Sequence, residues 1–214
     1  MSDGDVLHAA VRAALSLAAE RDWETLSLSE IAEAAGVPLT DFYGLGGIAA
    51  IAAGIEPFFD QCMSSEAAEP EDTARDRLFD VIMRRYEAME PHRDGLISIQ
   101  LWRERSPMRI AALLRARQAS AKWALVCAGL DGEPGPPLAL KSANVAWAIA
   151  MADRAWRKDV NGDFARTMST LDRELRDAEG RAKRYAAFAG RRSHRASEAS
   201  EGAPEAPPTE TSQG

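Results

Sequence analysis

One stretch of this 214-residue chain decides its fold: Ser27-Leu-Ser-Glu-Ile-Ala-Glu-Ala-Ala-Gly-Val-Pro-Leu-Thr40. Ser27 and Glu30 have the spacing of a capping box, in which two side chains satisfy free backbone amides at the start of a helix. Apolar residues then follow at helical spacing. The pattern predicts a short helix from about Ser29 to Ala35.

A sharp turn and a further helix follow this segment. Gly36 suits the left-handed residue that ends a helix, and Pro38 suits the first turn of the next helix, which is expected over residues 39–45. Residues 7–20 carry an apolar stripe and predict a longer first helix. Two short helices braced by a longer one are typical of a DNA-binding helix-turn-helix, although an ordinary helical corner uses the same glycine and cap.

Several runs resemble the N-terminal domain of the TetR family of regulators. They are Ala19-Glu-Arg-Asp-Trp23, Thr25-Leu-Ser-Leu28, Ile31-Ala-Glu-Ala-Ala-Gly-Val37 and Asp41-Phe-Tyr43. The resemblance implies an all-α fold of about nine helices, a C-terminal domain that binds small molecules, and a homodimer. It also implies that the DNA contacts come from Ser27, Pro38, Leu39, Thr40, Asp41 and Tyr43. Family members carry a phosphate-binding lysine shortly after the tyrosine, where this chain reads Gly44-Leu-Gly-Gly-Ile48.

The charge of this region opposes DNA binding. No lysine or arginine lies between Arg21 and Arg75, and residues 1–60 hold two arginines against ten carboxylates, a net charge of −8. Affinity for duplex DNA comes largely from Lys and Arg, with about six to ten phosphate contacts in strongly salt-dependent proteins. Helix N-termini and backbone amides also bind phosphates. The sequence therefore predicts weakened DNA binding.

Composition limits the remaining function classes. With 46% hydrophobic and 28% charged residues, the chain is typical of a globular protein. We find no long apolar run and no secretory signal, so a cytoplasmic location is expected. Cys62 and Cys127 are far apart, and no nucleophile motif, phosphate loop or metal-ligand spacing is present. We expect no enzyme activity, no metal and no cofactor.

The rest of the chain is predicted to be helical. A helix should start near 69–72 and end at 90–95, followed by helices over 96–102, from Pro107 to Ala128, over Leu138 to Trp156, and over Phe164 to Ala178 with Asp163 as its cap. Residues 129–137 should form a loop. The expected domains are a helix-turn-helix domain (1–60), a ligand-binding and dimerisation domain (61–179) and a basic helix end with a disordered tail (180–214).

Two sets of residues are candidates for binding surfaces in the second domain. Plain core packing is the better explanation for each large apolar side chain taken singly, but as a set those on consecutive helices would permit a pocket for a small apolar ligand or lipid: Phe79, Met83, Tyr86, Met89, Trp102 and Trp123. By the TetR resemblance, the last two predicted helices would form the dimer face through Trp147, Met151, Phe164, Met168, Leu171 and Leu175.

A second resemblance gives an alternative function. Trp156-Arg-Lys-Asp159, Asp163-Phe164, Thr167-Met168 and Leu171-Asp-Arg-Glu-Leu175 are similar to a TetR-like lipid-binding accessory protein of coenzyme Q biosynthesis, which implies lipid binding without DNA binding. Residues 180–195 hold six basic residues and no acidic one, interleaved with Tyr185 and Phe188. Such a segment can lie on an anionic membrane, contact nucleic acid or be a solvated helix end. Residues 197–214 are predicted to be disordered.

Overall fold

The computed structural model describes residues 2–201, and every regular element in that range is a helix. Eight α-helices are joined by turns and four short 3-10 helices. The α-helices are α1 (Asp3–Glu20), α2 (Leu28–Ala35), α3 (Gly47–Asp60), α4 (Ala74–Met89), α5 (Arg93–Glu104), α6 (Pro107–Cys127), α7 (Leu138–Trp156) and α8 (Ala165–Glu201). The all-α prediction is confirmed, and the number of helices is close to the nine expected.

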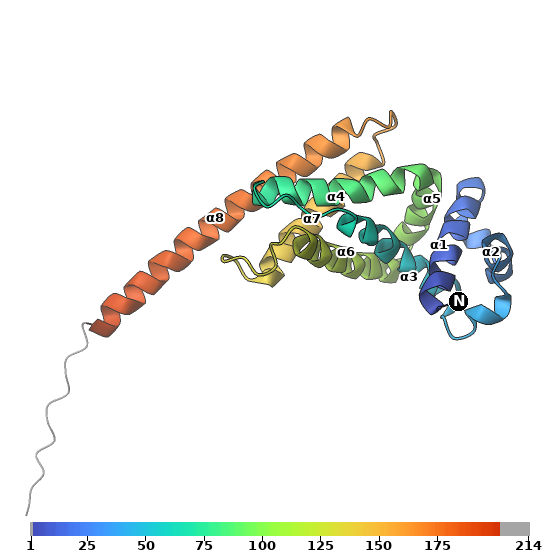
Figure 1. Cartoon of the computed structure of the whole chain (residues 1–214), viewed down its shortest axis with the longest axis horizontal. Helices are drawn as coiled ribbons and strands as arrows, with labels where there is room; N and C mark the ends of the chain where they lie inside the picture. Colours follow the sequence, from blue (N-terminus) through green and yellow to red (C-terminus); the bar gives the residue numbers. More distant parts are fainter. Residues whose placement is uncertain (1, 202–214) are drawn as a thin grey trace, which may run out of the picture.

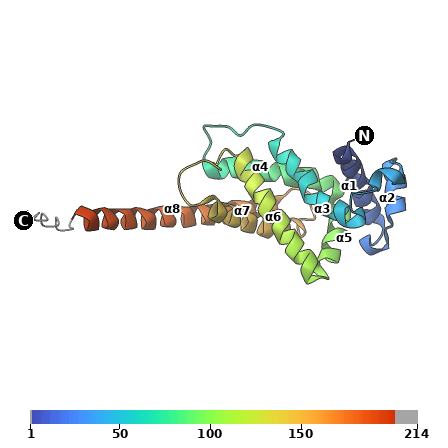
Figure 2. The same cartoon turned by 90° about the horizontal axis from the view of Figure 1, so that it is seen from below.

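The helices form a body with one long projection (Figure 1). Helices α1 and α2 lie at one end, α3 to α7 form the central body, and α8 packs along α7 and α4. The C-terminal half of α8 then extends away from the body at the end opposite to α1 and α2, as the second view also shows (Figure 2). None of the described helices has an apolar stretch long enough to cross a membrane.

Helix α1 begins earlier than its apolar stripe predicts. Ser2 and Asp5 form a capping box, in which the Asp5 amide donates to the Ser2 hydroxyl at 3.2 Å and the Ser2 amide donates to the Asp5 carboxylate at 3.1 Å. The predicted start at residue 7 is therefore wrong by one turn. The buried face of α1 carries small residues and Leu15, so α5 can approach it closely.

The prediction of a third helix over residues 39–45 is wrong. Only Leu39–Phe42 is helical, as a 3-10 turn, and Tyr43 is extended. Gly44, Gly46 and Gly47 all have a positive φ, from 67° to 93°, which a right-handed helix does not tolerate. The glycines therefore end the recognition element after one turn and begin α3.

Helices α4 and α5 are displaced from their predicted bounds. Helix α4 starts at Ala74, capped by Thr73, because the Thr73 hydroxyl accepts from the Asp76 amide at 3.2 Å. Residues 90–95 do not end the helical path, since a 3-10 turn over Glu90–His92 leads directly into α5. A Cβ at Gly95 would lie 2.1 Å from the Leu15 carbonyl oxygen. Glycine is therefore required for α5 to pack against α1.

Helices α6 and α7 follow the sequence prediction closely, whereas α8 is longer than predicted. Helix α6 starts at Pro107 and α7 spans Leu138–Trp156 as expected, with a loop between them. Asp163 caps α8 through the Ala165 amide at 3.1 Å, and the buried Asp159 accepts from two more amides of that first turn. Helix α8 continues to Glu201 instead of ending near 178. Part of the predicted disordered tail is thus helical, and residues 202–214 lie outside the described range.

Candidate functional site

The first helix and the turn of the helix-turn-helix have the form that their local signals predict, whereas the element after the turn is a single 3-10 turn over Leu39–Phe42. The Ser27 hydroxyl donates to Glu30 at 2.7 Å, and the Ser27 amide donates to the same carboxylate at 2.9 Å. Gly36 ends α2 with a φ of 65°, in the left-handed region. Because the Ser27 hydroxyl is used in the capping box, a DNA phosphate would have to compete with Glu30 for it.

The surface offered beyond the turn is small. Phe42 is buried under α1, whereas Leu39 is 50% exposed and Tyr43 is 96% exposed. Thr40 and Asp41 are also exposed, and the Thr40 hydroxyl lies 3.4 Å from the Asp41 carboxylate. Five of the six predicted DNA-contact residues therefore lie together on the exposed segment 38–43, whereas Ser27 lies apart from them as the cap of α2.

Part of the −8 net charge of residues 1–60 is neutralised by ion pairs or buried in the structure. Glu30 pairs with Arg21 at 2.9 Å, and Glu24 pairs with Arg105 at 3.1 Å. Glu56 and Asp60 are buried and face the body. Within the described residues, six carboxylates keep no cationic partner, namely those of Asp3, Asp5, Glu20, Asp22, Glu33 and Asp41. The helix-turn-helix surface stays acidic, but less so than the sequence count suggests.

A buried cluster of charges joins α3 to the body, and sequence reasoning did not find it. Arg85 of α4 donates to Glu56, and to Asp60 at 3.0 Å. Arg103 of α5 donates to Glu56 at 2.7 Å and to the Ala52 carbonyl oxygen at 2.7 Å. We call these four residues, Glu56, Asp60, Arg85 and Arg103, the buried ion cluster. The available signal was two acids four residues apart in an otherwise apolar helix.

The cluster extends to α6 and α7. Ser120 donates to Asp60 at 2.7 Å, and Asp153 of α7 accepts from Arg117 at 2.6 Å and from Tyr86 at 2.9 Å. Asp153 also lies 3.6 Å from Arg85. Five helices are therefore tied to one another through a connected set of buried polar groups.

The charges of the cluster shift its pKa values in opposite directions. Burial opposes ionisation of Glu56, but Arg85 and Arg103 outweigh it and lower the pKa of Glu56 to about 2. Burial raises the pKa of Asp60 in spite of the neighbouring Arg85. Burial opposes the charge of Arg85, and Glu56, Asp153 and Asp60 nevertheless raise its pKa. The Glu56 carboxylate is thus the most strongly stabilised anion of the cluster.

The six residues predicted to line a ligand pocket are not brought together around one cavity. Met83, Tyr86 and Met89 are buried in the core, and Phe79 and Trp102 pack against it. Trp123 is 40% exposed, and its indole N–H donates to the Asp60 carbonyl oxygen at 3.0 Å. Where α3, α4, α5, α6 and α7 meet, the buried ion cluster leaves a cavity of about 30 Å³. For most of these residues the core-packing alternative fits the structure.

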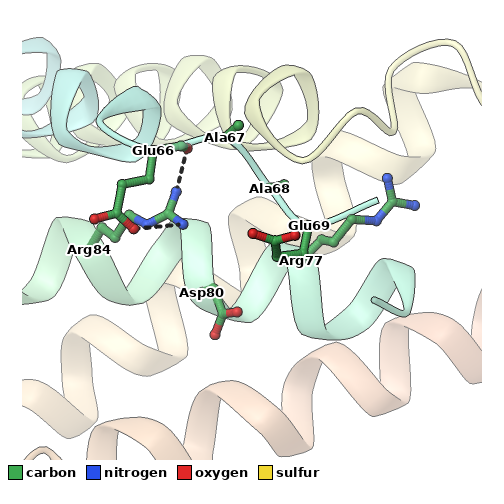
Figure 3. Close-up of a pocket in the computed structure, with 7 residues that line it drawn as sticks. All are labelled: Glu66, Ala67, Ala68, Glu69, Arg77, Asp80 and Arg84. Atoms are coloured by element: carbon green, nitrogen blue, oxygen red, sulfur yellow. Dashed lines mark hydrogen bonds and ion pairs between the residues drawn. The ribbon is translucent and has the colours of Figure 1, made fainter. Parts of the chain in front are cut away.

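Larger hollows lie at the periphery. A cleft of about 480 Å³ lies between residues 66–69 and α4 (Figure 3), but its lining is charged, and Arg84 is bonded to both the backbone and the side chain of Glu66. A cavity of about 270 Å³ lies between α3, α5 and α6, lined by Trp102, Met108 and several alanines. A third, of about 180 Å³, is bounded by α4, α6, α7, α8 and the loop before α7.

The predicted dimer residues divide into two groups. Leu171 and Leu175 are buried inside the protomer, where α8 packs on α7 and α4, so they are not available to a partner. Trp147 and Met168 are 56% and 39% exposed, and Met151 and Phe164 are half-buried. The exposed part of the set lies on the outer surface of α7 and α8.

The basic segment over residues 180–195 belongs to the projecting half of α8. Lys183, Arg184 and Arg191 are exposed, whereas Arg181 donates to Asn144 of α7 at 2.7 Å. The side chains of Arg192 and Arg195 lie outside the described part of the chain. The positive charge of α8 is therefore placed at the end of the molecule remote from the helix-turn-helix (Figure 1).

Comparison with known proteins locates this arrangement among solved folds. A TetR transcriptional regulator from Nitrosomonas europaea ATCC 19718 superposes with a TM-score of 0.63 at 21% identity, covering 81% of this chain and 97% of that one. The chain has the TetR fold. A TetR transcriptional regulator from Rhodococcus sp. RHA1 agrees, with a TM-score of 0.61 at 14% identity, 83% of this chain and 97% of that one. No protein-family model and no curated protein sequence matches this TetR-fold chain.

Proposed function

We propose that this chain is a ligand-responsive transcriptional regulator that binds DNA as a homodimer. The observation that carries the proposal is a helix-turn-helix on a TetR fold, with its capping box, its left-handed Gly36 and a short 3-10 turn that exposes Leu39 and Tyr43. The TetR transcriptional regulators from Nitrosomonas europaea and Rhodococcus share that fold over most of their length. The exposed residues Trp147 and Met168 of α7 and α8 supply the dimer face.

The geometry also suggests how a ligand signal would reach DNA. Helix α3 follows the helix-turn-helix in the chain. Its Glu56 forms ion pairs with Arg85 of α4 and Arg103 of α5, and its Asp60 forms an ion pair with Arg85. A small displacement of α4 or α5 therefore moves α3. In a dimer this changes the separation of the two recognition elements and so their fit to half-sites about one DNA turn apart.

Selection of binding sites from random duplex DNA tests the proposal. At low salt the protein should enrich a short palindrome, because a two-fold dimer reads two equal half-sites. Tyr43→Ala should weaken binding of the selected duplex about tenfold, as expected for the loss of one base or phosphate contact of about 1–3 kcal/mol. Val160→Ala, which truncates another highly exposed side chain, between α7 and α8, should have no effect. Enrichment of no sequence at low salt would refute DNA recognition.

The projecting half of α8 favours a second candidate, a lipid-binding protein that works next to a membrane. Its exposed Lys183, Arg184 and Arg191 with Tyr185 suit an anionic lipid surface. Sedimentation with vesicles of phosphatidylglycerol and phosphatidylcholine tests it. Binding should be lost in the double variant Arg184→Glu, Arg191→Glu and kept in Arg115→Glu, Lys122→Glu, which reverses two exposed charges on α6. Absence of the wild-type protein from the vesicle pellet would exclude this candidate.

A further inference from the structure

We propose that the cavity at the α4, α7 and α8 end of the body is a binding site for a small apolar carboxylate, with Lys141 and Arg75 as its cationic mouth. The interior of this cavity, which we call the distal cavity, is formed by aliphatic side chains and prolines from five segments: Leu78, Leu125, Leu130, Pro134, Pro136, Val145 and Leu175. Its volume is about 180 Å³. The site is distinct from the six aromatic and methionine residues expected from the sequence.

The size of the distal cavity limits what it can hold. An engineered apolar cavity of about 150 Å³ binds benzene, so about 180 Å³ accommodates one ring or a chain of roughly six carbons. A long acyl or isoprenoid chain would not be contained within this volume. The apolar part of the ligand is therefore small.

The charged groups at the mouth are unequally paired. Both carboxylates there already have a cation, since Glu133 accepts from Arg77 at 2.7 Å and Glu179 lies 2.6 Å from Lys183. Lys141, in contrast, donates only to backbone carbonyl oxygens among the described residues, to Leu130 at 3.2 Å and to Glu133 at 2.5 Å. Its charge is held in place without a carboxylate partner.

Arg75 adds a second positive charge, and it shares each of its carboxylates with another partner. Its nearest carboxylates are Asp76 at 3.4 Å and Asp172 at 3.7 Å. Asp76 is used to cap α4 with Thr73, and Asp172 is bound more closely by Arg176, at 2.5 Å. An anionic head group at the mouth would complete the pairing of Arg75 and Lys141, whereas a cationic one would be repelled. The lining thus combines an apolar interior with an anion-selective mouth.

Helices α4 and α7 line the distal cavity and also carry residues at the buried ion cluster. Leu78 and Arg85 are seven residues apart on α4 and therefore lie on the same face of that helix. Val145 and Asp153 are eight residues apart on α7 and lie on neighbouring positions of one face. A ligand that shifts either helix would therefore act on the residues that hold α3. This regulatory consequence rests on the proposed function, whereas the binding itself does not.

Calorimetric titration with four probes of similar size tests the site: benzoate, hexanoate, benzyl alcohol and benzylamine. Benzoate and hexanoate should bind, benzyl alcohol should bind at least tenfold more weakly, and benzylamine should not bind. Lys141→Met and Arg75→Met should each weaken benzoate about tenfold, whereas Arg115→Met, at an exposed position on α6, should not. Val145→Phe should block all probes by filling the cavity.

Two outcomes would overturn the proposal: absence of benzoate and hexanoate binding by the folded wild-type protein, or binding that Val145→Phe leaves unchanged. Circular dichroism of each variant separates loss of the site from loss of the fold. Failure of the proposed function gives a different result. A protein that binds benzoate but no DNA duplex would support the ligand site and contradict the proposed role as a regulator. Release of a selected duplex by benzoate, abolished in Lys141→Met, would support both.

Discussion

At the scale of single residues, Glu56 is the carboxylate through which α3 is held by both α4 and α5. It is buried, accepts from two arginines on two helices, and joins the helix-turn-helix to the body. Buried ion pairs do not add much to stability over an apolar replacement, but removing one partner leaves the other charge buried and unpaired. The cluster therefore acts mainly to fix the position of α3.

The variant Glu56→Gln should lower the free energy of unfolding by about 3–5 kcal/mol, because Arg85 and Arg103 keep their burial and lose their main counter-charge. Urea unfolding followed by circular dichroism measures the change. Glu66→Gln is the matched control, since Glu66 pairs with Arg84 on the surface and should cost less than about 1 kcal/mol. Equal losses for the two variants would contradict a special role for Glu56.

The same residue makes stability depend on acid. The pKa of Glu56 is lowered from 4.5 to about 2 in the folded protein, so ionised Glu56 stabilises the fold above pH 4.5, and this contribution disappears as the pH falls toward 2. The raised pKa of Asp60 acts in the opposite sense. Unfolding free energies of wild type and Glu56→Gln should therefore converge between pH 4.5 and 2. Curves that stay parallel over that interval would refute the assignment.

At the scale of elements, the sequence predicted correctly those helix starts and ends that depend on interactions between residues close together in the chain. The capping box at Ser27, the left-handed Gly36 and the start of α6 at Pro107 all depend on interactions within a few residues, and all are found where the sequence places them. The recognition helix was overestimated because three glycines with positive φ override the helical spacing of its apolar residues. The buried ion cluster joins residues 25 to 47 positions apart, so the two acids of α3 mark a polar site in the sequence but no local pattern identifies their arginine partners.

The turn of the helix-turn-helix provides a prediction at this scale. Gly36→Ala should destabilise the protein by about 1–2 kcal/mol, because a side chain at a φ of 65° brings its Cβ close to the following carbonyl. No neighbouring atom lies within 4 Å of a Cβ built there, so the cost is conformational. Thermal unfolding measures it. Gly132→Ala, in open space and without a positive φ, should be neutral, and a loss as large as that of Gly36→Ala would count against this explanation.

At the scale of the whole molecule, the charge is divided between two ends. The helix-turn-helix end is acidic, and the basic half of α8 projects from the opposite end. In a dimer formed through the outer surface of α7 and α8, both acidic ends still have to approach DNA. Phosphate contacts would then come from backbone amides and from polar side chains such as Thr40 and Tyr43.

The proposed dimer can be tested at the most exposed residue of its predicted face. Trp147 is 56% exposed on α7 and donates to Glu174 of α8 at 3.0 Å. Trp147→Glu would place two like charges opposite each other across a two-fold interface, and we expect a monomer. Sedimentation velocity distinguishes the two species. Leu114→Glu, a similarly exposed apolar residue on α6, should stay dimeric, and a dimer in both variants would place the interface elsewhere.

The central claim is that this TetR-fold protein recognises DNA through an acidic helix-turn-helix with few cationic contacts. The most direct measurement is how the affinity for the selected palindrome changes with salt concentration. Fluorescence anisotropy measures this affinity at salt concentrations from about 50 to about 200 mM. We predict sequence-specific binding whose slope corresponds to fewer than about six phosphate contacts by lysine or arginine. A slope of about six to ten contacts, or no specific binding at the lowest salt, would contradict the account.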